Sequence, residues 1–128
     1  MEKNLTKKSR VQAYADERRD MEKNLIKVSP IYANMVEQLT KVYGSDGRKN
    51  GLDKLTKVLM AVGMAVHSGT ESGIDWAITR ALNHGGSPEQ IYDAIDVALL
   101  NGGSFVVSNV RFAHLALEYR LKHMKASE

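Results

Sequence analysis

The chain has 128 residues, no cysteine and a formal net charge of +3 at pH 7. This length suits a single domain, and the lack of cysteine excludes disulfides, thiolate metal sites and cysteine nucleophiles. The apolar runs are too short for a membrane span, and the basic N-terminus lacks a secretory signal, so we expect a cytoplasmic protein without membrane contact. The four histidines lack zinc-motif spacing, so we expect no metal and no cofactor.

The positive charge is concentrated in residues 1–50. A basic segment of this kind can contact nucleic acid. Aromatic residues do not alternate with the basic ones there, as a base-stacking surface would require. We therefore interpret this basic segment as solvent-exposed and expect no nucleic-acid partner.

An internal repeat divides the N-terminal region. The first five residues, MEKNL, recur at 21–25, and the similarity extends to three further pairs: Lys7/Lys27, Ser9/Ser29 and Val11/Ile31. We interpret residues 1–20 as an extension that is dispensable for folding, 21–124 as a single helical domain and 125–128 as a frayed tail. A cloning or start-site artefact is the competing explanation of the repeat.

Helix signals then follow in chain order. Ser29-Pro30 predicts a helix start, and the turn-rich residues 44–47 end that helix. A second helix begins near residue 52, with apolar residues at steps of three and four. Ser68 and Glu71 fit a capping box, which predicts a third helix ending at the glycines after His84.

Ser87 and Gln90 form a second capping box, and Ser104 is expected to open the last helix. The apolar side of that last helix is expected to face inward, namely Phe105, Val106, Val110, Ala113, Leu117 and Leu121. The pattern predicts an all-α bundle of about six helices. Its segment 88–101 is apolar nearly all round, which indicates a subunit interface.

Residues 52–117 resemble the carboxymuconolactone decarboxylase family, which includes the alkyl hydroperoxidase D group. The matching stretches are 52–60 (LDKLTKVLM), 81–91 (ALNHGGSPEQI) and 93–103 (DAIDVALLNGG). The resemblance implies an all-α fold and a homo-oligomer, with a trimer or hexamer as the expected assembly.

Two chemistries accompany this resemblance: decarboxylation of a lactone acid, and peroxide reduction by a Cys-x-x-Cys dithiol with a helper histidine and a glutamate. The dithiol positions correspond to Thr70 and Gly73, the histidine position to Ala77 and the glutamate position to Val58. These side chains can neither form a disulfide nor transfer protons in this role. The decarboxylase histidine position is also Ala77, so that chemistry lacks its expected acid or base.

Two hypotheses remain open. In the first, the protein is a non-catalytic oligomeric scaffold or a binder of a small carboxylate, and the vestigial family site is lined by Thr70, Gly73, Trp76 and Ala77. In the second, it is a lyase-type or decarboxylase-type enzyme acting on a small carboxylic acid or lactone. His67 and Glu71, with Asp75 four residues further on, would then supply a relocated acid–base site. A deep pocket holding His67 and Glu71 would favour the enzyme.

Overall fold

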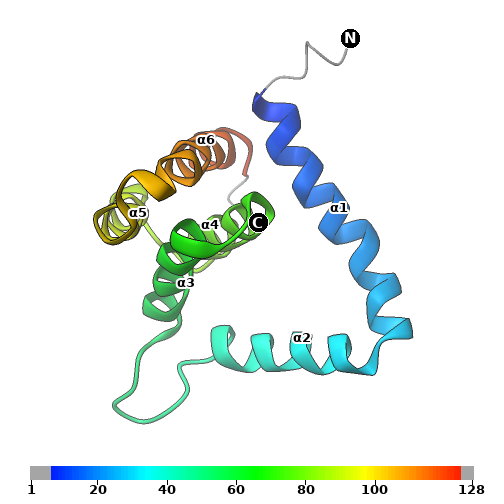
Figure 1. Cartoon of the computed structure of the whole chain (residues 1–128). Coiled ribbons are helices and arrows are strands. Elements are labelled where there is room, and N and C mark those ends of the chain that lie inside the picture. Colours follow the sequence, from blue (N-terminus) through cyan, green and yellow to red (C-terminus); the bar gives the residue numbers. More distant parts are fainter. Residues whose placement is uncertain (1–6, 125–128) are drawn as a thin grey trace.

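The computed structural model describes residues 7–124, and these fold into α-helices joined by short turns and, between residues 43 and 54, by a longer loop, which confirms the all-α prediction. In chain order the elements are α1 (Lys7–Val28), α2 (Pro30–Tyr43), α3 (Lys54–Ser68), α4 (Glu71–Asn83), α5 (Pro88–Gly102), the 3-10 turn η2 (Gly103–Val106) and α6 (Val107–His123). Helices α3 to α6 form a bundle, while α1 crosses one side of it and α2 returns towards α3 (Figure 1). No described helix is both long and apolar enough to cross a membrane.

The core lies where α3, α4, α5 and α6 meet. Each helix contributes apolar side chains three and four residues apart, as a one-sided helix stripe requires. The fully buried larger side chains are Val58, Val62, Val66, Ile74, Ile78, Ile91, Ile95, Phe112 and Leu117, joined by Val11 of α1. The closest packing is between α3 and α5, where a Cβ on Gly63 would lie 3.5 Å from the carbonyl oxygen of Ala94.

The helix starts follow the capping signals in two of four cases. Ser29 caps α2, and Ser87 forms the expected capping box with Gln90. The prediction for α4 was wrong in its cap, because Thr70 rather than Ser68 accepts the first-turn N–H of Gly73, at 3.1 Å. Ser68 instead ends α3 and donates to the carbonyl oxygen of Met64.

The start of the last helix also differs from the prediction. Ser104 lies in the 3-10 turn η2, and α6 begins only at Val107 without a side-chain cap. Phe105 was expected to face inward but is 96% exposed, and Leu121 is also exposed. The tight turn points Val106 into the core in place of Phe105, which leaves the aromatic ring outside.

Helix α1 runs without interruption across the boundary expected at residue 20. Its first half packs on the bundle, since Val11 is fully buried in the common core and Tyr14 packs edge-on against Phe112. This packing argues against a dispensable extension. The first copy of the repeat, residues 1–5, and the expected frayed tail, 125–128, lie outside the described residues.

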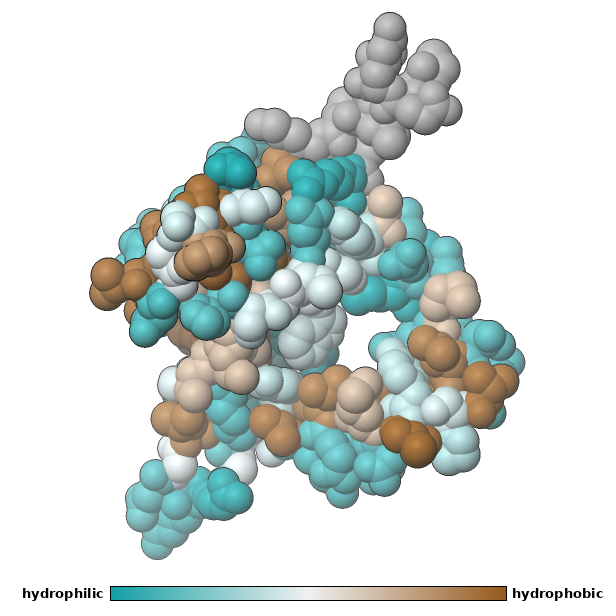
Figure 2. All heavy atoms as spheres, viewed as in Figure 1, coloured by the Kyte–Doolittle hydropathy of each residue, from teal (hydrophilic) through white to brown (hydrophobic). Residues whose placement is uncertain are grey.

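The second half of α1 and all of α2, residues 21–43, form what we call the arm. None of the α2 residues is buried. The exposed apolar side chains of the arm are Met21, Leu25, Ile26, Val28, Ile31, Met35 and Val42. In Figure 2 apolar side chains lie along α2 and around its junction with α1, and an opening separates this region from the bundle. The chain itself therefore leaves the apolar side of the arm uncovered.

Candidate functional site

The positions that correspond to the family's reacting groups lie in packed or capped surroundings. Val58 on α3 and Ala77 on α4 are both buried in the core. Thr70 uses its hydroxyl oxygen as the cap of α4, accepting the N–H of Gly73. Trp76 is half-buried and packs edge-on against Tyr43 of α2, with ring centroids 5.7 Å apart. The reacting positions Val58, Thr70, Gly73 and Ala77 therefore offer no group suited to general acid–base catalysis.

Asp75 lies behind these positions and is fully buried. Arg120 of α6 holds it with two hydrogen bonds, from Nε at 3.0 Å and from Nη2 at 2.8 Å. Arg18 of α1 donates to the same carboxylate at 2.8 Å and also to the carbonyl oxygen of Ser72. A buried carboxylate is stable only when it is paired and hydrogen-bonded. Asp75 thus joins three helices rather than facing solvent as an exposed residue.

Glu71, one turn earlier on α4, also faces α1. It accepts a hydrogen bond from the Tyr14 hydroxyl at 2.8 Å and forms an ion pair with Arg10. The hydrogen bond to this carboxylate, together with burial, raises the pKa of Tyr14, because both favour the protonated phenol. Arg10 lies over the ring of Phe112, which continues the contact into the core. The first turn of α4 is therefore held by α1.

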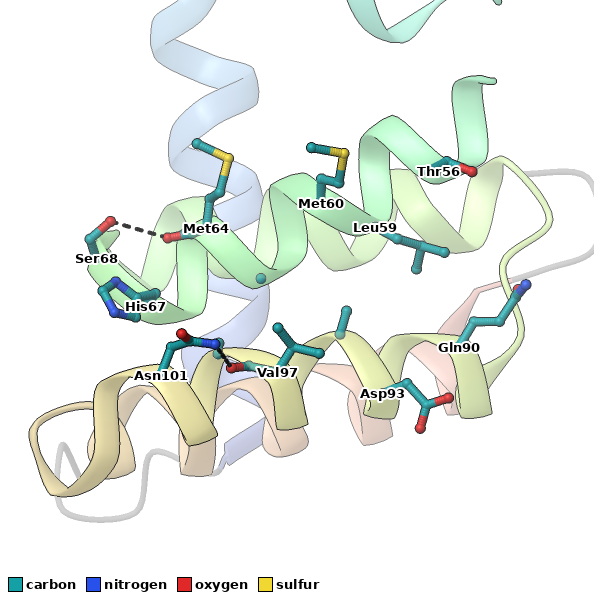
Figure 3. A pocket seen from close by; sticks show the side chains of 13 residues that line it. Thr56, Leu59, Met60, Met64, His67, Ser68, Gln90, Asp93, Val97 and Asn101 are labelled. Carbon is teal, nitrogen blue, oxygen red and sulfur yellow. Dashed lines mark hydrogen bonds between the residues drawn. The ribbon is translucent and has the colours of Figure 1, made fainter. Parts of the chain in front are cut away.

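A groove of about 720 Å³ runs between α3 and α5 on another side of the bundle. Its lining residues are Thr56, Leu59, Met60, Gly63, Met64, His67, Ser68, Gln90, Asp93, Ala94, Val97, Ala98 and Asn101. Figure 3 shows His67 and Asn101 opposite each other at one end, with Gln90 and Asp93 towards the other end. The middle of the groove is apolar and its ends are polar.

The structure separates the two residues of the predicted acid–base pair. His67 is exposed and lines the groove, whereas Glu71 belongs to the contact with α1. Across residues 10–124, no hydrogen bond or ion pair connects them. The four-residue spacing would bring them together only on a continuous helix. The chain leaves the helix at Gly69, in an extended conformation, before α4 begins.

His84 closes α4 through its backbone, and its ring is half-buried. Burial, followed by the charges of Arg80 and Lys54, lowers the pKa of His84, so the neutral form is favoured at neutral pH. The cap is thus made by backbone N–H groups rather than by a charged imidazole.

Sequence reasoning missed the residues that hold α1 to the bundle. Arg18 and Arg120 clamp Asp75, and Tyr119 donates to the Gln12 side chain at 2.6 Å. A weak signal existed, since Gln12 to Arg18 present polar and aromatic groups at helical spacing beside the apolar Val11. Within residues 10–124, no group of three or more acidic or histidine side chains is arranged to hold a metal ion.

The comparison with known families settles the relationship of the chain. Residues 33–113 match the profile of the carboxymuconolactone decarboxylase family. The chain belongs to this family. The match covers α3, α4 and α5, together with most of α2 and the first part of α6, but not α1. A comparison with curated proteins finds no significant match.

Solved structures of other family members share the fold. A protein from Thermotoga maritima, suggested to act in the antioxidative response, is 25% identical over 86% of this chain and 91% of its own, with a TM-score of 0.74. A second structure of that protein gives a TM-score of 0.75 and covers 91% of this chain and 99% of its own. A family protein from Legionella pneumophila, 20% identical over 91% of this chain and 99% of its own, has a TM-score of 0.73 and supports the fold alone.

Proposed function

We propose that this chain is a non-catalytic, homo-oligomeric member of the family without thiol peroxidase activity. The observation that carries the proposal is that the family's reacting positions hold side chains without reactive groups in this chain. Val58 and Ala77 are packed in the core, and the Thr70 hydroxyl is used to cap α4. The full sequence contains no cysteine that could replace the dithiol. Peroxide reduction by a thiol needs a thiolate, and this chain has none to offer.

The nearby carboxylates support the same proposal because they already have structural partners. Asp75 is paired with Arg18 and Arg120, and Glu71 with Arg10 and Tyr14. A general base must reach its substrate's proton and accept it. Carboxylates engaged in this way instead connect helices, and removing one partner of such a buried pair is costly.

The exposed apolar surface supports assembly into a homo-oligomer. Large apolar side chains are exposed on both the bundle and the arm, with Leu100 and Phe105 at 85% and 96%. Exposed apolar patches on a folded chain mark interaction sites. The expected all-round apolar segment, now α5, indeed leaves Val97 and Leu100 uncovered within one chain.

A second candidate rests on the groove between α3 and α5. An apolar middle with His67 and Asn101 at one end would suit a small ligand with an apolar body and a polar head, such as a small carboxylic acid or lactone. In that case His67 would act without Glu71. We rank this candidate second because the groove is an open trough, with Met60 and Met64 exposed at its side.

Three measurements test the proposal. Peroxide turnover with a dithiol reductant, in a metal-free sample, should stay at the no-protein level, while a dithiol-containing family member serves as the positive control. A parallel screen with small carboxylic acids and lactones should detect no turnover. Turnover that disappears in His67→Ala but survives in Glu71→Gln would replace the proposal with the second candidate. Light scattering should give a multiple of the 14.2 kDa chain mass.

A further inference from the structure

We propose that the arm of one copy, residues 21–43, lies in the groove between α3 and α5 of a second copy. This inference rests on the homo-oligomer proposed above and names the two surfaces that meet. It commits to a second copy of this chain as the occupant of the groove. Each copy carries both surfaces, and each surface is uncovered in the single chain.

The groove has the shape and chemistry that receive a helix. Its floor consists of the small residues Gly63, Ala94 and Ala98, so α3 and α5 approach closely there and leave room above. Met64 and Val97 flank it and are 67% and 61% exposed. An amphipathic helix laid in an apolar groove, with anchors every three or four residues, is a recurrent mode of recognition. Flexible methionines adapt readily to such a partner.

The arm supplies a helix surface that matches this groove. Ile31, Met35 and Val42 lie along one side of α2, at steps that return to the same face of a helix, and Ile31 is 85% exposed. The lengths also agree. The 14 residues of α2 span about 21 Å, and the 15 residues of α3 or α5 span about 22 Å.

Charge favours the same pairing. Helix α5 carries Glu89, Asp93 and Asp96 and no lysine or arginine. Lys23 and Lys27 stand next to the apolar residues of the arm. Within residues 10–124, none of these five groups takes part in an ion pair. Opposite charges beside an apolar contact increase the rate of association and fix its register.

A second copy accounts for both uncovered surfaces at once. An unrelated partner in the groove would leave the arm exposed, and a small ligand in the groove would do the same. When each copy offers its arm and receives another, as in a reciprocal pair or a closed ring, the arm and the groove are covered in every copy. The opening between arm and bundle in Figure 2 gives the second copy access to the arm.

The absence of cysteine from the natural sequence allows a clean cross-linking test. Two single-cysteine variants are made, Ile31→Cys on the arm and Met64→Cys in the groove, and one carries a mass tag. They are mixed, exchanged under dilute conditions and oxidised. We expect at least fivefold more mixed disulfide than when Ile31→Cys is mixed with Lys49→Cys, a control in the exposed loop before α3.

A charge-reversal series gives an independent measurement. The double variant Lys23→Glu, Lys27→Glu should dissociate at a concentration at least tenfold higher than the natural chain. Adding Asp93→Lys and Asp96→Lys should restore association.

The outcomes separate this inference from the homo-oligomer on which it rests. In one outcome, light scattering gives an oligomer while the mixed disulfide shows no excess and charge reversal has no effect. That result would overturn the arm-in-groove contact but not the homo-oligomer. A monomer at tens of micromolar would overturn both. Excess mixed disulfide together with charge rescue would establish the contact.

Discussion

Val11 and Ile31 occupy equivalent positions in the two copies of the repeat, yet Val11 is fully buried whereas Ile31 is 85% exposed. The first lies where α1 meets α4 and α6, with Tyr14 and Arg18 beside it. The second lies on the exposed side of the arm, which the chain does not cover. Similar local sequence therefore meets two different surroundings, and the tertiary partner decides which copy stabilises the single chain.

The largest expected effect comes from removing the anchored region. A chain beginning at Met21 loses Val11 from the core, and Asp75 and Glu71 lose their α1 partners. We expect a loss of at least about 4 kcal/mol in the free energy of unfolding, or roughly 10 °C or more in the thermal midpoint. A midpoint within a few degrees of the full chain would restore the interpretation of residues 1–20 as a dispensable extension.

The next largest effect is expected at the buried ion pairs of Asp75, which connect the anchored part of α1 to the bundle. Asp75→Asn keeps the shape but removes the buried negative charge that Arg18 and Arg120 both contact, which costs about 3 kcal/mol. The matched control is Glu118→Gln on the exposed side of α6, where we expect a change under about 0.5 kcal/mol. Urea denaturation of both variants measures the difference. Equal effects would show that the pair around Asp75 has no special role.

Truncating the equivalent repeat positions compares the two regions directly. Val11→Ala removes two methyl groups from the core and should cost about 2 kcal/mol. Ile31→Ala, measured at a concentration where the chain is dissociated, should change the stability by less than about 0.5 kcal/mol. Thermal melts at several protein concentrations would give both values. A large effect of Ile31→Ala in the dissociated chain would mean that the arm packs on its own bundle.

The smallest expected effect concerns pH. Burial, with help from Arg80 and Lys54, holds the pKa of His84 below its usual value. As pH falls through about 6.5, the unfolded chain therefore binds this proton before the folded chain does, and stability declines. Stability from this residue is complete above that pH. In His84→Asn the decline should be smaller, as measured by the urea midpoint between pH 7.5 and pH 5.5; an unchanged slope would contradict the assignment.

Local signals in the sequence predicted much of the fold correctly. Ser87, Pro88 and Gln90 define the start of α5 because a capping box needs only residues within one turn. The cap predicted at Ser68 was wrong because the extended backbone at Gly69 separates Ser68 from α4, so that Thr70 caps this helix instead. The prediction that Phe105 faces inward was wrong for a related reason. The 3-10 turn directs successive side chains differently from an α-helix.

The candidate site could be predicted only in part. Positions Thr70, Gly73 and Ala77 follow from the resemblance to the family motif; Thr70 caps α4, Gly73 lies in its first turn and Ala77 lies in its middle. The pairing of His67 with Glu71 assumed a straight helix, which the turn at Gly69 interrupts. The partners of Asp75 could not be predicted, because Arg18 and Arg120 are 57 and 45 residues away and no local periodicity encodes such contacts.

The clamp on Asp75 has a consequence for how the protein opens. Its carboxylate joins α1, α4 and α6, so detachment of either outer helix leaves a buried charge with half of its partners. Fraying of α1 or α6 therefore also disrupts the buried ion pairs of Asp75. The three helices should behave as one cooperative unit in hydrogen exchange. Amides of α4 around Asp75 should exchange only through global unfolding. Those of α2 should exchange through local unfolding, which has a much lower free energy.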